Sequence, residues 1–425
     1  MELYDKYLAC GGVVATDSRT LKGGELFFAL KGENFDGNAY AMKALEAGAA
    51  YAVVNASADL PDDPRLIKVP DTFAALQELA IYHRENVKPG GALPVIGLTG
   101  TNGKTTTKEL VAAVLSKKFC VTATKGNFNN DIGVPLSLLS ITPETQIAVI
   151  EMGANHPDDI AKLVRVSRPD YGLITNVGKA HLLGFGSFEG VKHAKGLLYD
   201  YLKEHEGIAF ANADDAVLQE MLWDREMTRI PYGMEGLELL PSSADNPFLR
   251  LRFPDGYVLK TSLVGAYNAN NVLAALKIGW FFEVPEAAAR AAVEAYVPSN
   301  NRSQLQKTAR NTVIVDAYNA NPSSMAVALD NLALCTGRKV ALLGDMRELG
   351  AESAAEHAKV VERLKGQEAF LVGEEFTKAA EGTGIPTFAT SDDLAAFLQQ
   401  HPLEGCTVLV KGSRGTRMEK VIPSL

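Results

Sequence analysis

The stretch Gly97-Leu98-Thr99-Gly100-Thr101-Asn102-Gly103-Lys104-Thr105-Thr106 decides most of what the sequence predicts. An apolar run at 95–98 leads into a turn that contains three glycines, and a helix-forming stretch follows the turn. In a strand–loop–helix of this kind, backbone N–H groups and the positive end of the helix bind phosphate oxygens. Lys104 can then reach the terminal phosphates of a nucleotide, and the Thr105 hydroxyl can hold Mg²⁺.

The spacing of this loop differs by one residue from the general pattern G-x-x-x-x-G-K-[ST]. That pattern would place its first glycine at position 98, where the chain has Leu98, and the glycine instead stands at 97. We therefore predict a variant of the phosphate loop in which the first glycine stands one residue earlier than in the general pattern.

Length and composition indicate an ordinary globular protein of two or three domains. The chain has 425 residues, of which 47% are hydrophobic and 22% charged, with a net charge of −9. A negative chain has no overall attraction for nucleic acid or for an anionic membrane, so local groups must hold any bound phosphate. We expect a monomer that binds no nucleic acid and does not insert into a membrane.

The sequence also predicts a cytoplasmic location. The N-terminus Met1–Asp5 is acidic and polar, unlike a signal peptide, and no apolar run is long enough to span a bilayer. The four cysteines, at 10, 120, 335 and 406, are scattered without a C-x-x-C motif. We interpret them as buried thiols in a reducing compartment.

Alternating apolar and helix-forming stretches predict an α/β protein with three domains. These are a small α/β domain at 1–90, a central phosphate-loop domain with a mostly parallel sheet at 91–300, and a Rossmann-like domain at 301–425. The proline- and glycine-rich stretch 228–263 predicts a small antiparallel insertion. Ligands of such sheets lie beyond the C-terminal strand ends, where Asp316 and Lys411 fall.

Other polar residues also follow predicted strands. Glu151 ends a strand expected beside the phosphate loop, where Mg²⁺ binding is favoured over a solvated carboxylate. His181 follows another strand end, and its residue type leaves structural and functional roles open. Lys195 by itself is typical of a surface helix. The polar run 126–135, with Asn127, Asn129 and Asn130, is either a plain loop or a ligand-binding one.

Taken together, these motifs closely resemble the Mur ligases, ATP-dependent enzymes that build the peptidoglycan stem peptide. Their form of the phosphate loop is similar to Gly100–Thr105, which explains the shifted glycine. The resemblance covers essentially the whole chain. It also rests on the stretches 17–19 (Asp-Ser-Arg), 35–37 (Phe-Asp-Gly), 126–135, 316–322 (Asp-Ala-Tyr-Asn-Ala-Asn-Pro), 343–346 (Leu-Gly-Asp-Met) and 411–414 (Lys-Gly-Ser-Arg).

The resemblance implies a role for each matching residue. ATP would contact Gly100, Thr101, Asn102, Gly103, Lys104, Thr105, Thr106, Asn268, Asn271, Arg302, Asp316 and Asn319, with the adenine at Asn268 and Asn271. The metal and catalytic set would be Lys104, Thr105, Glu151, His181 and a carbamylated Lys195, with two Mg²⁺ ions. The substrate would contact Ser18 and Arg19 at its uridine diphosphate end, together with Asn127, Asn129 and Asn130.

The implied activity is the ligation of D-alanyl-D-alanine to UDP-N-acetylmuramoyl-tripeptide with ATP, through an acyl phosphate. The sequence Asp-Asn-Pro-Arg, by which the preceding ligase recognises diaminopimelate, is absent. Asn38, Tyr267 and Leu197 depart from the family's usual residues. The alternatives are another ligase of the superfamily, either a different Mur ligase or a folylpolyglutamate synthase, and a non-catalytic binding protein regulated by a nucleotide.

Overall fold

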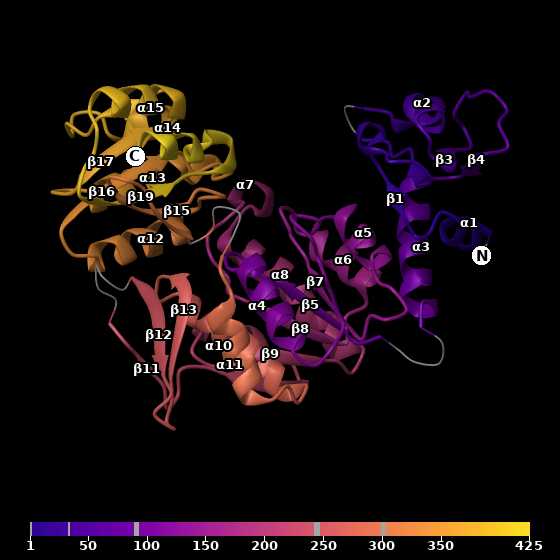
Figure 1. Ribbon diagram of the computed structural model, residues 1–425, viewed down its shortest axis with the longest axis horizontal. Coiled ribbons are helices and arrows are strands. Elements are labelled where there is room, and N and C mark those ends of the chain that lie inside the picture. The colour runs from indigo at the N-terminus through magenta and orange to yellow at the C-terminus, as the bar shows by residue number, and fades with distance from the viewer. Residues whose placement is uncertain (1, 33–34, 89–92, 242–246, 299–301, 303) are drawn as a thin grey trace.

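The structure is a computed structural model that describes residues 2–32, 35–88, 93–241, 247–298, 302 and 304–425. Three α/β units follow one another along the chain, with the first and the last at opposite ends of the molecule and the second between them (Figure 1). The predicted fold class is therefore confirmed. The predicted domain boundaries, between 90 and 91 and between 300 and 301, lie outside the described residues.

The first unit has a four-stranded parallel sheet in the order β1-β2-β3-β4. Its elements are α1 (Glu2–Ala9), β1 (Val14–Ala15), β2 (Leu26–Phe28), α2 (Ala41–Glu46), β3 (Tyr51–Asn55), β4 (Leu66–Val69) and α3 (Thr72–Asn86). Two short 3₁₀ helices, Ser18–Thr20 and Gly37–Tyr40, begin beside aspartates whose side chains accept backbone N–H hydrogen bonds. These caps satisfy donors that a helix start leaves free.

The first unit is joined to the second by buried polar contacts as well as by apolar packing. Helix α3 packs against α5 (Gly133–Leu139). The hydroxyl of Tyr7 donates to the carbonyl of Leu139 at 2.7 Å, and Nε2 of His83 donates to the carbonyl of Ile141 at 2.8 Å. The hydroxyl of Tyr4 donates to Nδ1 of His83 at 3.2 Å, so both ring nitrogens are used.

The second unit is built on a six-stranded parallel sheet in the order β10-β9-β8-β5-β7-β6. Its elements are β5 (Val95–Thr99), α4 (Lys104–Leu115), β6 (Val121–Ala123), α5, β7 (Ile147–Glu151), α6 (Asp159–Ser167), β8 (Tyr171–Ile174), α7 (Leu182–Phe185), α8 (Phe188–Glu204), β9 (Ile208–Asn212), α9 (Ala216–Trp223) and β10 (Thr228–Tyr232). Every residue of β5 and β7 is buried, as expected for a sheet covered on both faces. Because β7 and β8 flank β5, the loops after these three strands meet at one edge.

The antiparallel insertion is smaller than predicted. Strands β11 (Glu238–Leu239), β12 (Phe248–Arg252) and β13 (Val258–Val264) form an antiparallel sheet, but 228–232 pairs in parallel with β9 as the edge of the large sheet. Pro231 suggested a break, yet a proline is tolerated on an edge strand because an outward-facing N–H is not needed there. Helices α10 (Asn268–Phe281) and α11 (Glu286–Ala295) follow and pack against α4.

The third unit has a six-stranded sheet in the order β14-β15-β19-β16-β17-β18, in which only the β14–β15 pair is antiparallel. Its elements are β14 (Gln304–Lys307), β15 (Thr312–Asp316), α12 (Pro322–Leu334), β16 (Arg338–Gly344), α13 (Ser353–Arg363), β17 (Glu368–Val372), α14 (Glu374–Ala379), β18 (Thr387–Phe388), α15 (Ser391–Gln400) and β19 (Cys406–Lys411). Three 3₁₀ helices, Gly350–Glu352, Arg414–Thr416 and Met418–Ser424, complete the unit.

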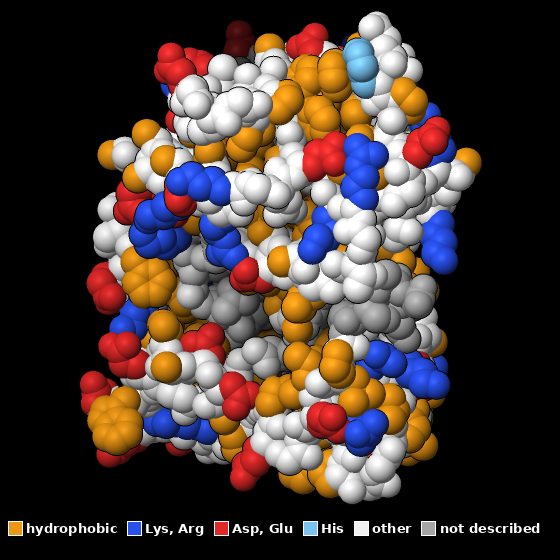
Figure 2. All heavy atoms as spheres, turned by 90° about the vertical axis from the view of Figure 1, so that its left-hand side faces the viewer, with side chains coloured by type: hydrophobic (Ala, Val, Ile, Leu, Met, Phe, Trp, Pro, Cys, Tyr) orange, Lys and Arg blue, Asp and Glu red, His pale blue; other side chains and the backbone are white. Residues whose placement is uncertain are grey.

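Two surface properties bear on the sequence predictions. In Figure 2, Lys or Arg and Asp or Glu side chains are interspersed on the visible face, which is hollowed between its upper and lower parts. Among the described residues, no helix is both long and apolar enough to span a membrane.

All four cysteines are free, but Cys120 is exposed and Cys335 only half-buried, so the prediction of four buried thiols is wrong for these two. Cys120 immediately precedes the short outer strand β6, which leaves it at the surface.

The buried imidazole of His83 should make the stability of this packing depend on pH. Burial lowers the pKa of His83, whereas an unfolded histidine titrates near 6.5. Below that pH the unfolded state binds more protons than the folded state, so the free energy of unfolding falls as the pH falls. We expect the wild type to lose more stability between about pH 7.5 and about pH 5.5 than His83→Gln does, measured by urea unfolding. Parallel pH profiles for the two proteins would contradict this.

Candidate active site

The phosphate loop lies between β5 and α4 and is closed around the side chain of Lys104. Its ammonium donates to the carbonyl oxygens of Gly100 at 2.7 Å and of Thr101 at 3.2 Å. Gly103 has a φ of +79°, and a Cβ on Gly100 would lie 1.9 Å from Oγ1 of Thr175. Both positions therefore require glycine. The first turn of α4 follows directly, so its free N–H groups face the same space.

The neighbouring strand fixes this loop through two residues to which the sequence analysis assigned no role. Asn102 donates its N–H to Oδ1 of Asn176 at 3.0 Å. The Asn102 carbonyl accepts from Oγ1 of Thr175 at 2.6 Å and from Nδ2 of Asn176 at 3.0 Å. The available signal was their place directly after β8, because β8 adjoins β5.

Glu151 lies at the end of β7 and faces the start of α4. Its Oε1 accepts hydrogen bonds from Oγ1 of Thr105 at 3.2 Å and from Nδ2 of Asn129 at 2.8 Å. Its Oε2 is buried and has no hydrogen-bond partner. A buried carboxylate oxygen without a donor is costly unless a cation binds it. The pair Thr105 and Glu151 therefore fits a divalent cation.

Two lysine side chains are buried in this region. Burial is the main cause that lowers the pKa of Lys104, and Glu151 opposes the shift. The pKa of Lys195 is lowered well below its ordinary value, first by burial and then by the nearby charge of Lys104. Lys195 is only 3% exposed and lies on α8 with its ammonium 5.9 Å from the centre of the Phe185 ring. It is thus not the surface lysine that its residue type alone suggested.

His181 immediately precedes α7 and reaches toward the third unit. Its Nδ1 donates to Oε2 of Glu348, a residue that the sequence analysis did not single out. Burial is the main cause that lowers the pKa of His181, and the carboxylate of Glu348 opposes this. The backbone continues the contact, because the N–H of Leu183 donates to the carbonyl of Glu348 at 3.2 Å. The second and third units therefore meet at His181.

The opposite side of the site is formed by the start of α10. Asn271 accepts from Oγ1 of Thr107 at 3.0 Å and donates through Nδ2 to Oδ1 of Asn268 at 2.9 Å. Asn268 in turn donates to the carbonyl of Val264 at 2.9 Å. These bonds fix both amides beside the phosphate loop.

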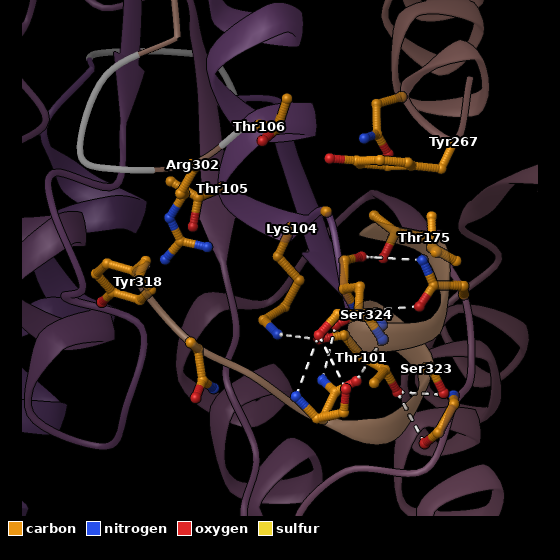
Figure 3. A pocket seen from close by; sticks show the side chains of 18 of the residues that line it. Thr101, Lys104, Thr105, Thr106, Thr175, Tyr267, Arg302, Tyr318, Ser323 and Ser324 are labelled. Atoms are coloured by element: carbon orange, nitrogen blue, oxygen red, sulfur yellow. Dashed lines mark hydrogen bonds between the residues drawn. The ribbon is translucent and has the colours of Figure 1, made fainter. Parts of the chain in front are cut away.

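The third unit closes the site with the loop after β15. Nδ2 of Asn321 donates to Oδ1 of Asn102 at 2.8 Å, which links this loop to the phosphate loop. The Arg302 guanidinium lies over the ring of Tyr318, 3.6 Å from its centre, as Figure 3 shows. Lys411 donates to Oδ2 of Asp316 at 2.5 Å. The site is therefore completed only when the third unit is in place.

Together these residues line one cavity of about 520 Å³. Fifteen of the residues predicted for the site line it: Thr101, Asn102, Gly103, Lys104, Thr105, Thr106, Asn127, Asn129, Glu151, His181, Asn268, Asn271, Arg302, Asp316 and Asn319. The lining also includes Thr175, Asn176, Tyr318, Asn321 and Lys411. In Figure 3, Lys104 points toward the loop around Thr101, whereas Tyr267 lies on the far side of the cavity.

Five predicted residues lie outside the lining of this cavity. Gly100 supports the loop, Lys195 is buried on α8, and Asn130 accepts the N–H of Gly133 at 2.8 Å. Ser18 and Arg19 belong to the first unit, where the exposed guanidinium of Arg19 pairs with Asp17 at 2.7 Å.

The described residues contain no group of three or more His, Cys, Asp or Glu side chains that could hold a metal ion. Mg²⁺ commonly takes only one or two carboxylates from a protein and its other ligands from phosphates and water. The carboxylate of Glu151 beside the phosphate loop matches that kind of site.

Comparisons with known proteins agree with this geometry. Three family descriptions match the chain: "Mur ligase family, catalytic domain" at 12–84, "Mur ligase middle domain" at 98–279 and "Mur ligase, glutamate ligase domain" at 301–414. The UDP-N-acetylmuramoyl-tripeptide–D-alanyl-D-alanine ligase of Escherichia coli is 38% identical over 97% of this chain and 93% of its own.

Solved structures are similar over the same length. A crystal structure of MurF from Acinetobacter baumannii has a TM-score of 0.85 at 32% identity and covers 99% of this chain and 97% of its own. The MurF ligase of Thermotoga maritima in complex with ADP has a TM-score of 0.84 at 27% identity, covering 97% and 96%.

Gly103→Ala should weaken nucleotide binding. The new Cβ would lie 2.7 Å from Oδ1 of Asn271 and would adopt a φ of +79°. The matched control is Gly382→Ala, which has a φ of +76° and open space around the new methyl group. Both variants should lose about 1–2 kcal/mol of stability to backbone strain. Only Gly103→Ala should raise the ATP dissociation constant in calorimetry, by roughly tenfold or more. Equal dissociation constants for the two variants would contradict the assignment.

Proposed function

Because this chain belongs to the Mur ligase family, we propose that it is the ATP-dependent ligase that joins D-alanyl-D-alanine to UDP-N-acetylmuramoyl-tripeptide in peptidoglycan synthesis. The Escherichia coli relative is named for this reaction, and its similarity extends over nearly the whole chain. The function is therefore one of cell-wall biosynthesis.

The observation that carries the proposal is the concentration of positive charge around the phosphate loop. Lys104 and Arg302 line the cavity, and Glu151, at the end of β7, is a carboxylate of the same lining. A transferred phosphoryl group spreads negative charge over its oxygens, and fixed cations in a partly dry pocket stabilise that charge strongly. This arrangement suits the γ-phosphate of ATP.

ATP binding is supported further by the ADP complex of the Thermotoga maritima relative. We assign the phosphates to the loop 100–106 and the adenine to Asn268 and Asn271, which border the loop on its far side. Arg302, Asp316 and Asn319 line the cavity from the third unit, and we assign them to the ribose and phosphates.

We assign Mg²⁺ to Thr105 and Glu151, and a second ion to His181 with a carbamylated Lys195. When bound, the metal ions would neutralise charge on the phosphates and align the reacting oxygens. Burial favours the neutral amine of Lys195, and a neutral amine can add CO₂ and become an anionic carbamate. That anion would offset the charge of Lys104.

The proposed reaction has two steps, in which the residues of the cavity would hold ATP and the two substrates. The terminal carboxylate of the tripeptide attacks the γ-phosphorus. The bond between that phosphorus and the oxygen bridging to the β-phosphate breaks, and ADP leaves. The amine of D-alanyl-D-alanine then attacks the carbonyl carbon of the acyl phosphate, the carbon–oxygen bond breaks, and phosphate and a proton are released. Lys104 stabilises the phosphoryl oxygens in the first step. Closure by the third unit, through Asn321 and Asn102, limits hydrolysis of the intermediate.

The remaining assignments concern the UDP substrate. Ser18 and Arg19 would hold its uridine diphosphate end on the first unit, and the loop with Asn127, Asn129 and Asn130 would contact it near the carboxylate. Two of these amides line the cavity, and Asn129 also bonds to Glu151, which supports a place beside the reacting groups.

One assay separates the proposed function from its alternatives. Phosphate release from ATP is measured with UDP-N-acetylmuramoyl-peptides of different lengths plus D-alanyl-D-alanine, and with folate plus glutamate. We expect release that depends on both the tripeptide substrate and the dipeptide. Release only with folate and glutamate would identify a folate enzyme, and ATP binding without release in any mixture would identify a non-catalytic protein.

Lys104→Ala should lower turnover about a hundredfold or more, as the loss of an electrostatic stabiliser usually does. The matched control is Lys117→Ala, which removes an exposed lysine just past the end of α4. Steady-state phosphate release with both substrates measures the effect. Near-normal ligation by Lys104→Ala would rule out the role.

Lys195→Ala should lose activity that a small carboxylic acid such as acetate restores in part, because the added carboxylate replaces the carbamate. Lys203→Ala, at an exposed position near the end of the same helix, should remain active and unaffected by acetate. Rescue is measured as the rate of phosphate release against acetate concentration. Full activity of Lys195→Ala without any acid would contradict the carbamate.

A further inference from the structure

A second cleft lies at the junction of the second and third units, next to the cavity of the phosphate loop. It has a volume of about 740 Å³ and is lined by residues of 345–353, 372–375, 389–390 and 415–416, together with Leu183 of α7. His181 lines the first cavity and Glu348 lines the second cleft, and the two side chains contact each other. The two spaces are therefore neighbours across this pair.

The carboxylates that line the second cleft already have partners. Asp345 accepts the N–H groups of Glu375 at 3.1 Å and Phe376 at 2.9 Å. The other three pairs are Glu348 with His181, Glu374 with Lys378 and Glu375 with Ser353. These contacts satisfy the carboxylate oxygens, and Lys378 also pairs with Glu375.

Arg347 is different, because no hydrogen bond or ion pair joins it to another residue that the structure describes. Among the described residues that line the second cleft, Arg347 is the one with a cationic side chain, and it is exposed. Its guanidinium lies against the backbone of Gly415, where a Cβ would come within 2.5 Å of Cζ of Arg347. The absence of a side chain at 415 therefore leaves room for the guanidinium. The adjacent Glu348 has a φ of +63°, which turns the loop sharply after the arginine.

We infer that Arg347 binds the free carboxylate of the dipeptide substrate in this cleft and so determines the choice of acceptor. The inference rests on the proposed function. An unpartnered guanidinium with planar donors suits a carboxylate, which it can bind through two parallel hydrogen bonds. With its carboxylate on Arg347, a small dipeptide extends along the cleft toward Glu348 and the neighbouring phosphate cavity, where its amine is needed.

The shape of the cleft supports the same orientation. Leu183 is 71% exposed, lines the cleft from the opposite unit and contacts Gly350 across it. An exposed leucine at this place offers an apolar surface to a methyl side chain such as that of alanine. Because Leu183 lies on α7 of the second unit, the acceptor would contact both units.

The test compares two acceptors, D-alanyl-D-alanine and D-alanyl-D-alaninamide, whose terminal carboxylate is replaced by a neutral amide. Phosphate release is measured for the wild type, Arg347→Gln and Gly415→Ala, where the last keeps the charge but displaces the guanidinium. Arg417→Gln is the matched control, since Arg417 is an exposed arginine of the same region that lines neither cavity. Thermal unfolding confirms that each variant is folded.

We expect Arg347→Gln to raise KM for D-alanyl-D-alanine roughly ten- to hundredfold, the loss typical of a charged hydrogen bond, with little change in KM for ATP. The wild type should prefer the dipeptide to its amide, Arg347→Gln should lose that preference, Gly415→Ala should weaken it, and Arg417→Gln should keep it. An unchanged KM for the dipeptide in Arg347→Gln, or a rise confined to the UDP substrate, would overturn the inference while ligation by the wild type upholds the proposed function. No ligation by the wild type would overturn both.

Discussion

The burial of two lysine side chains close together is the constraint on which the rest of the site depends. Lys104 is surrounded by its own loop, Lys195 lies on α8, and burial together with the charge of Lys104 lowers the pKa of Lys195. Burying a cation without an anion is costly, so a charged Lys104 favours the binding of anionic groups beside it, and Lys195 favours its neutral form. The polar groups around them, from Asn102 and Asn176 to the unpartnered oxygen of Glu151, therefore form a site that anions and a divalent cation would complete.

The junction between the second and third units converts this charge into a closed reaction site. Asn321 bonds to Asn102 of the phosphate loop, and Lys179 forms ion pairs with Glu352 at 3.1 Å and Glu356 at 3.2 Å. These contacts join segments that follow the C-terminal ends of parallel strands in two different sheets, the edge at which such sheets bind ligands. The phosphate cavity and the second cleft share this junction. A movement of the third unit would therefore open both spaces together.

Much of the fold and of the cavity could be predicted because strand ends are visible in the sequence. Thr105, Glu151, His181 and Asp316 follow or end apolar runs, and parallel strands bring such positions to one edge. The antiparallel insertion was placed too early because Pro231 resembles a break when its neighbour β9 is unknown. The pairs His181–Glu348 and Asn102–Asn321 join residues 167 and 219 positions apart, and no local pattern specifies them. The same holds for Arg347, whose setting depends on Gly415.

The central claim is that the cationic pocket transfers the γ-phosphoryl group of ATP to the tripeptide carboxylate before the amide forms. A tripeptide substrate whose terminal carboxylate carries heavy oxygen tests this directly, because the attacking oxygen remains on the phosphate that is later released. Mass spectrometry of the inorganic phosphate after ligation with D-alanyl-D-alanine should find one labelled oxygen in each phosphate, in proportion to the peptide formed. Complete ligation with unlabelled phosphate would contradict the account.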